Sequence, residues 1–248
     1  MNIAICQTNM KWTVEENLEQ IKVFMQNAVT QKADLAIFPE CAVTGYHRKL
    51  PQNCQPQLLQ SAFDNVSEMA TQLKLDVIVG SPYIFPQTPD QRCNSALYFN
   101  AQNAEIQIAS KIGLTDGERQ FFTPGKKRGI FTIQNKRVGV IFCREIIDRE
   151  ELLTDFRDEQ IDFIIWPSYI KWDADPDYPE YVSEEMWIGL SRELGIPVVN
   201  ANWANALNGS DITGMGGSVL AELGETAFRC QVDKDMLHIT SVSVSYTH

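Results

Sequence analysis

Short apolar runs that alternate with amphipathic helical segments constrain the fold of this chain more than any other feature of its sequence. The first three runs lie at residues 2–6, 34–39 and 77–80, and the helical segments between them at residues 13–28 and 58–73. Each run has the length and composition of a buried strand. The first helical segment begins with a capping-box pattern, Thr13 with Glu16. This alternation predicts an α/β fold.

The rest of the 248-residue chain continues the pattern. Further strands are predicted within residues 95–110, 130–133, 138–143, 161–167 and 197–200, a loop over 112–128, a helix over 182–194, and mostly strand after residue 214. No stretch rich in Ser, Gly or Pro divides the chain. A single domain over residues 1–248 is therefore favoured over two domains.

The charge balance argues against two classes of partner. The chain has 21 Lys and Arg residues against 32 Asp and Glu residues, which gives a net charge of −11. Binding to nucleic acid or to an anionic membrane needs clustered positive charge. The one short basic cluster, Lys126-Lys127-Arg128, is too small to supply it. We therefore expect no nucleic acid and no membrane among the partners.

Cysteine usage and hydropathy predict a cytoplasmic protein with reduced thiols. The six cysteines are scattered, without the density of a disulfide scaffold or the close pairs of a zinc site. Three dispersed histidines do not suggest a metal site either. No apolar run reaches the roughly 18 residues of a membrane span, and the N-terminal segment turns polar too early for a signal peptide.

Three reactive side chains follow directly on apolar strands. Glu40, Lys111 and Cys143 stand where predicted strands end, which is where α/β sheets commonly build their sites. A thiol needs a base or a positive field to become nucleophilic, and a lysine can stabilise the oxyanion that forms when sulfur attacks carbon. Taken singly, each residue also fits a structural role, a core cysteine or a solvated charge.

A series of motifs in a fixed order strengthens the catalytic interpretation. The motifs are Phe38-Pro39-Glu40 with Thr44-Gly45-Tyr46, Asn94-Ser95-Ala96 with Lys111-Ile112-Gly113-Leu114, 118–125, 139–145, Trp166-Pro167-Ser168, 195–202 and Gly216-Gly217-Ser218. Together they resemble the nitrilase superfamily of carbon–nitrogen hydrolases, in its amidase-like branch. The resemblance runs from Ile3 to about Ala227.

The resemblance implies a four-layer α–β–β–α sandwich and a Glu–Lys–Cys catalytic set. By this analogy Cys143 attacks the substrate carbon and Glu40 is the general base. Lys111 and the backbone N–H of Arg144 bind the oxyanion, while Glu118 orients the substrate nitrogen and assists proton transfer. A thioester forms and water releases the acid.

The resemblance also implies which partners to expect. Tyr46 and Ser168 are expected to contact the substrate, no metal or organic cofactor is needed, and the chain is expected to form a homo-oligomer, a dimer or larger. The favoured substrate is a small carboxamide. The alternatives are an N-carbamoyl or nitrile hydrolase, an acyltransferase, and a catalytically silent binding protein.

Some positions depart from the family pattern or have two interpretations. The family often has an aromatic residue at 109, histidine at 113 and an aromatic residue at 144, where this chain has Ala, Gly and Arg. His47 either lines the pocket or lies on the surface. The acidic segment 173–185 is a loop near the site, a subunit contact or a solvated face. Cys41 is a rival nucleophile, but it should face away if Glu40 faces the pocket.

Overall fold

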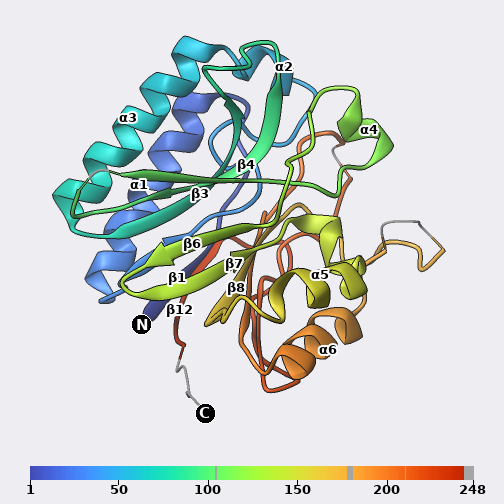
Figure 1. Cartoon of the computed structure of the whole chain (residues 1–248). Coiled ribbons are helices and arrows are strands. Elements are labelled where there is room, and N and C mark those ends of the chain that lie inside the picture. The colour runs from blue at the N-terminus through green and yellow to red at the C-terminus, as the bar shows by residue number, and fades with distance from the viewer. Residues whose placement is uncertain (104, 178–180, 210, 243–248) are drawn as a thin grey trace.

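Two six-stranded β-sheets lie face to face in the computed structural model (Figure 1). The structure describes residues 1–103, 105–177, 181–209 and 211–242. The first sheet has the order β12-β1-β2-β3-β4-β5, and the second has the order β11-β10-β9-β8-β7-β6. The strands β1, β2 and β3 pair in parallel, as do β7, β8 and β9, whereas the remaining pairs are antiparallel. Parallel strands at the centre of each sheet place their carboxyl ends at one edge.

The strands have the following bounds. In the first sheet they are β1 Asn2–Gln7, β2 Leu35–Ile37, β3 Asp76–Ile84, β4 Arg92–Phe99, β5 Ile106–Ser110 and β12 Met236–Ser241. In the second sheet they are β6 Gly129–Ile133, β7 Lys136–Val140, β8 Phe163–Ser168, β9 Val198–Asn202, β10 Val219–Glu222 and β11 Glu225–Arg229.

Helices cover the outer face of each sheet (Figure 1). The helices α1 Val14–Thr30 and α3 Pro56–Leu73 pack on the first sheet, and α5 Arg149–Phe156 and α6 Glu184–Leu194 pack on the second. A third apolar core fills the space between the sheets. The α–β–β–α sandwich expected from the sequence is therefore confirmed. Within the described ranges, no helix is long and apolar enough to cross a membrane.

Helix α1 begins as its sequence predicts. The Thr13 hydroxyl accepts a hydrogen bond from the backbone N–H of Glu16 at 3.2 Å, and the Glu16 carboxylate accepts one from the backbone N–H of Thr13 at 3.2 Å. This capping box satisfies N–H groups that have no partner inside the helix. The apolar stripe of the helix then faces the sheet.

The structure corrects three local expectations. The predicted loop 112–128 contains the short helix α4 Asp116–Arg119, which is capped by Thr115. The sequence did not predict helix α5. The strand predicted over 138–143 ends at Val140, and Cys143 instead opens a short 3₁₀-helix, η1 Cys143–Ile147. The physical reason is the φ angle of Cys143, +36°, which is incompatible with a strand.

Close packing of β3 fixes the backbone of the segment that follows β2. A Cβ atom on Gly80 would lie 2.3 Å from the Pro39 carbonyl oxygen, 2.5 Å from the Cys41 nitrogen and 2.7 Å from Cα of Glu40. Only glycine allows this approach. Gly80 therefore helps to determine where Glu40 stands.

We expect Gly80→Ala to destabilise the protein, because the new methyl group must push against backbone atoms. Overpacking of this kind costs about 1–3 kcal/mol. Chemical denaturation of the variant and of wild type measures the difference. The matched control is Gly117→Ala in α4, where the nearest atom to a new Cβ is 3.8 Å away. Wild-type stability in Gly80→Ala would show that β3 can move back without cost.

Candidate active site

The side chains predicted to act together come from four different elements. Glu40 follows β2, Lys111 follows β5, Glu118 lies on α4, and Cys143 is the first residue of η1. The structure brings all four to the same end of the sandwich. Lys111, Glu118 and Cys143 line one pocket, and Glu40 lies directly behind Lys111.

A buried ion cluster forms the floor of this pocket. The Lys111 ammonium donates to Oε1 of Glu40 at 2.9 Å and to Oε1 of Glu118 at 2.6 Å. The side chains of Lys111 and Glu40 are 1% and 0% exposed. Charges removed from water this completely persist only when they are paired and hydrogen-bonded. Each member of the cluster therefore depends on the other two.

The two carboxylates of the cluster differ in how well they are satisfied. Glu118 Oε1 also accepts from the Tyr46 hydroxyl at 2.7 Å, and Glu118 Oε2 accepts from the backbone N–H of Thr115 at 2.8 Å. Glu40 Oε1 accepts from the Asn94 amide at 2.7 Å, but Glu40 Oε2 is buried with no hydrogen-bond partner among the described residues. The free oxygen of Glu40 can accept a proton, whereas Glu118 is held in place.

The surroundings move the pKa values of the two carboxyls in opposite directions. Burial raises the pKa of Glu40, and the neighbouring Glu118 charge adds to this, although Lys111 and Asn94 work against it. Burial would also raise the pKa of Glu118, but the Lys111 ammonium and hydrogen bonds from Lys111, Thr115 and Tyr46 hold it below its usual range. A raised pKa suits a carboxyl that takes up a proton, whereas a lowered pKa keeps a carboxylate ionised.

Lys111 remains charged despite its burial. Desolvation alone would lower the pKa of its ammonium, but the charges of Glu40 and Glu118 and the hydrogen bond to Glu118 raise it above its ordinary value. A permanent positive charge beside the nucleophile suits the stabilisation of an oxyanion.

Cys143 occupies a strained turn with its thiol at the pocket. The residue has φ +36°, in the left-handed region that residues with a side chain seldom adopt. Its carbonyl accepts from the Trp166 indole N–H at 2.8 Å, and its Sγ donates to the Tyr169 carbonyl at 3.3 Å. Burial, followed by the Glu40 charge, raises the pKa of the Cys143 thiol. The resting residue is a thiol that needs a base.

The pocket above Cys143 has a volume of about 470 Å³, the size of a small-molecule site. Its lining residues are Tyr46, Lys111, Thr115, Glu118, Cys143, Arg144, Tyr169, Ile170, Lys171, Ala174, Asp175 and Val182. Tyr46 and Tyr169 meet edge to face, with ring centroids 5.2 Å apart, and form an aromatic wall beside the ion cluster.

Arg144 lines the pocket, and its side chain explains one departure from the family pattern. Its guanidinium pairs with Asp148 at 3.0 Å. A Cβ on Gly113 would lie 2.9 Å from Asp148 Oδ2 and 3.1 Å from Arg144 Nη1. Gly113 therefore leaves room for this ion pair. The backbone N–H of Arg144 lies in the first turn of η1, where a helix provides no acceptor for it.

Two of the sequence-predicted residues lie away from the pocket. Ser168 is fully buried, and its hydroxyl donates to the Trp166 carbonyl at 3.2 Å and accepts from the Asn200 amide at 2.8 Å. Ser168 is therefore not placed to touch a substrate there. His47 is buried, with Nε2 3.0 Å from the Lys11 carbonyl and Nδ1 accepting from the backbone N–H of Lys49 at 3.1 Å. His47 holds two loops together.

The acidic segment 173–185 contributes to the pocket wall through Ala174, Asp175 and Val182. Of the three interpretations of this segment, a position beside the site fits these residues. Tyr178 lies outside the described residues.

Sequence reasoning missed three residues that position the catalytic set. The Asn94 amide joins Glu40 to Glu118, at 2.7 and 3.4 Å, and the Trp203 indole donates to the Glu40 carbonyl at 2.8 Å. Asn94 lies in one of the quoted motifs, so a signal was present. Trp203 lies 163 residues from Glu40, and no local pattern links the two.

Glu145 is the third missed residue, and it connects the segment that follows Lys111 to the turn that carries Cys143. Its Oε1 accepts from the backbone N–H groups of Ile112 and Gly113, at 2.7 and 2.8 Å, and its Oε2 accepts from the backbone N–H of Phe142 at 2.8 Å. Arg128 pairs with the same carboxylate at 2.9 Å. One buried side chain thus fixes the residues beside both Lys111 and Cys143. Among the described residues, no group of three or more His, Cys, Asp or Glu side chains is arranged to hold a metal ion.

The comparisons with known proteins agree with this geometry. Residues 2–237 match the sequence model of the carbon-nitrogen hydrolase family, and the chain belongs to that family. An amidase from Nesterenkonia sp. superposes with a TM-score of 0.83 at 20% identity, over 99% of this chain and 91% of the amidase. That amidase is described as a member of the nitrilase superfamily, so the resemblance seen in the motifs is confirmed.

Longer proteins contain a similar unit. A glutamine-dependent NAD(+) synthetase from Acinetobacter baylyi is 23% identical in an alignment 242 residues long, which covers 93% of this chain and 42% of the synthetase. The glutamine-dependent NAD+ synthetase of Acinetobacter baumannii superposes with a TM-score of 0.76 at 20% identity, over 96% of this chain and 44% of that one. The chain thus spans less than half the length of these synthetases.

We expect limiting iodoacetamide to label Cys143 first. It is the one partly exposed cysteine of the six, all of which are described, whereas Cys41 is fully buried and its thiol donates to the side-chain Oδ1 of Asn94, 3.5 Å away. Reactivity follows access as well as thiolate fraction. Peptide mass spectrometry identifies the labelled residue. Cys41→Ala is the matched control and should label as wild type does, while first labelling at Cys41 would exclude Cys143 as the nucleophile.

Proposed function

We propose that this chain is an amidohydrolase that cleaves the C–N bond of a small carboxamide through a thioester on Cys143. The observation that carries the proposal is the buried cluster of Lys111 with Glu40 and Glu118, placed beside a strained cysteine in a small pocket. A structural ion pair would not need a reactive thiol at its side, and a binding module would not need a carboxylate oxygen left without a partner.

The first half of the proposed reaction transfers the acyl group to sulfur. Glu40 Oε2 takes the proton of the Cys143 thiol as sulfur attacks the carbonyl carbon. The oxyanion that develops is stabilised by the Lys111 ammonium and the backbone N–H of Arg144. The intermediate collapses, the C–N bond breaks, and Glu40 returns the proton to the leaving nitrogen. Ammonia or an amine departs and a thioester remains.

The second half releases the product acid. Glu40 removes a proton from water, which attacks the thioester carbon, and the Cys143 sulfur leaves and regains a proton. Glu118 stays ionised and fixes Lys111 through both steps. Tyr46 donates to Glu118 and lines the pocket, which supports the proposal that it contacts the substrate. The proposed reaction uses protein side chains and water alone.

The proposed substrate class rests on the size and lining of the pocket. A volume of about 470 Å³ accommodates a small molecule, and the aromatic pair Tyr46 and Tyr169 can pack against an acyl chain. The structural likeness to an amidase agrees with an amide rather than a nitrile. The glutamine-dependent synthetases suggest that a primary amide such as glutamine belongs in a substrate panel. Homo-oligomeric assembly and a cytoplasmic location stay predictions.

We expect ammonia release from at least one member of a panel of small primary amides, measured with an enzyme-coupled ammonia assay. Cys143→Ala should fold and show none. Lys111→Ala should lose about a hundred- to a thousandfold in turnover, the usual effect of removing an oxyanion donor. Ammonia release only from carbamoyl compounds or nitriles would redirect the proposal to those substrates. Product formation only with an added amine or thiol acceptor would indicate acyl transfer. Full activity of Cys143→Ala would exclude the mechanism.

The pH dependence of Cys143 alkylation should report the protonation of Glu40. Protonated Glu40 cannot accept the thiol proton, so the rate should fall as the pH falls through the pKa of Glu40, which burial raises above 4.5. In Glu118→Gln this fall in rate should occur at lower pH, because the Glu118 charge raises the pKa of Glu40. The measurement is the iodoacetamide rate against pH. In Glu40→Gln the fall in rate at low pH should disappear. If it persists, the base is another residue.

A further inference from the structure

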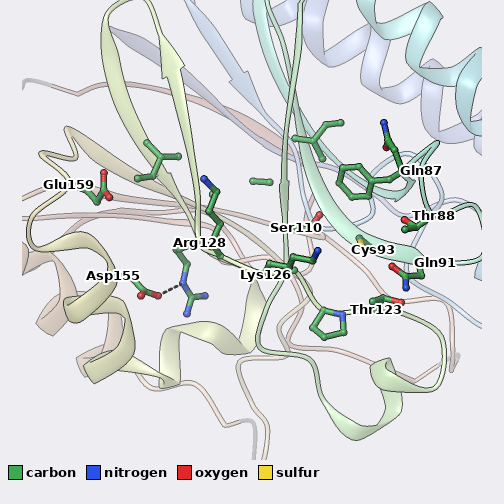
Figure 2. Close-up of a pocket in the computed structure, with 18 of the residues that line it drawn as sticks. Gln87, Thr88, Gln91, Cys93, Ser110, Thr123, Lys126, Arg128, Asp155 and Glu159 are labelled. Carbon is green, nitrogen blue, oxygen red and sulfur yellow. Dashed lines mark hydrogen bonds and ion pairs between the residues drawn. The ribbon is translucent and has the colours of Figure 1, made fainter.

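A second and larger pocket lies where the edge strands β5 and β6 of the two sheets meet (Figure 2). Its volume is about 880 Å³, and it shares no lining residue with the pocket above Cys143. The β3–β4 connection forms one side of it and α5 with the turn that follows forms the other. Its size is within the usual range of small-molecule sites.

The basic cluster noted in the sequence lines this pocket. Lys126 and Lys127 are exposed, and neither ammonium has an ion-pair or hydrogen-bond partner in the part of the chain that the structure describes. Arg128 is paired at 3.1 Å with Asp155 and at 2.9 Å with Glu145.

The other charges of the pocket are paired as well. Arg137 binds Glu159, and both residues line the pocket. Both carboxylates that line the pocket, Asp155 and Glu159, are thus matched by arginines. The pocket therefore has two unpaired positive charges, Lys126 and Lys127, on a chain whose net charge is −11.

The remaining lining combines neutral hydrogen-bonding groups with an apolar wall. Gln87, Thr88, Gln91 and Thr123 surround the same hollow as Lys126 (Figure 2). The apolar wall is formed by Phe85, Ile108, Ala109, Pro124 and Ile130. A ligand that fits this lining has an anionic end for the lysines, hydroxyl groups for the amides, and a carbon skeleton for the apolar wall.

We propose that this pocket binds a small organic phosphate, with the phosphate on Lys126 and Lys127. Lysine ammoniums bind phosphate as compact point charges. Two unpaired cations match a phosphate group, whereas a nucleic acid would need a longer row of them and would be repelled by the rest of the chain. The basic cluster is thus too small for a polyanion and suitable for a single phosphate.

Hydrogen bonds and an ion pair connect this pocket to the residues around Lys111 and Cys143, although the two pockets are separate. The backbone N–H of Gly125, next to Lys126, donates to the Lys111 carbonyl at 2.7 Å. Arg128 reaches Glu145, which holds the residues beside Lys111 and Cys143. Because of this connection, the test must separate binding here from binding at Cys143.

The experiment is isothermal titration calorimetry at low ionic strength with ribose 5-phosphate, adenosine 5′-monophosphate and pyrophosphate as probes. Uncharged ribose and adenosine are the matched controls for the phosphate. We expect at least one organic phosphate to bind with a Kd below about 1 mM, pyrophosphate to bind more weakly because it lacks a carbon skeleton, and the uncharged compounds not to bind.

Three variants locate the site. Lys126→Ala/Lys127→Ala should weaken binding by at least about tenfold, because charge-assisted hydrogen bonds are lost. Lys22→Ala/Lys234→Ala, which removes two exposed lysines outside the pocket, should bind as wild type does. Cys143→Ala should also bind as wild type does, and because binding is measured directly, the result is independent of amide hydrolysis.

The proposal is overturned by any of three results. These are no binding of any organic phosphate, equal binding by the Lys126→Ala/Lys127→Ala variant, and loss of binding in Cys143→Ala. The last result would place the phosphate in the pocket above Cys143. Tighter binding of pyrophosphate than of both organic phosphates would reject the role of the apolar wall.

Discussion

The positive charge of Lys111, buried between two carboxylates, is the interaction on which the rest of the site depends. Without Glu40 and Glu118, an ammonium that is 1% exposed would lose its proton or leave the interior. Without Lys111, two adjacent buried carboxylates could not both ionise. The cluster therefore shifts the pKa of each member, upward for Lys111, downward for Glu118 and upward for Glu40.

The scaffold serves this cluster by holding backbone segments at short distances. Gly80 allows β3 to lie against the segment that carries Glu40, and Trp203 binds the Glu40 carbonyl from the second sheet. Glu145 accepts hydrogen bonds from backbone N–H groups on both the segment after Lys111 and the segment before Cys143. Because such buried polar contacts leave little freedom, the side chains of the cluster are held in place, which is the condition that the proposed electrostatic catalysis needs.

Two of the three departures from the family pattern, at positions 113 and 144, are connected. Arg144 follows the nucleophile and pairs with Asp148, and that pair fills the space that a side chain at 113 would need. Gly113 and Arg144 therefore depend on one another. Arg144 lines the pocket above Cys143, and the ion cluster of Lys111, Glu40 and Glu118 is complete behind it.

From the sequence by itself, local periodicity predicted most strands and helices, and the resemblance to the carbon–nitrogen hydrolases implied the four layers and pointed to Glu40, Lys111, Glu118 and Cys143. It failed where distant segments decide the outcome. The end of β7 and the turn at Cys143 depend on Glu145 and Trp166. Only the tertiary structure showed that Lys111 contacts a glutamate 71 residues away, that Glu40 keeps one oxygen free, and that the basic cluster lines a pocket. The physical reason is that pKa values and hydrogen-bond partners are set by which groups share a buried space, and the distance between two residues along the chain does not determine whether they share it.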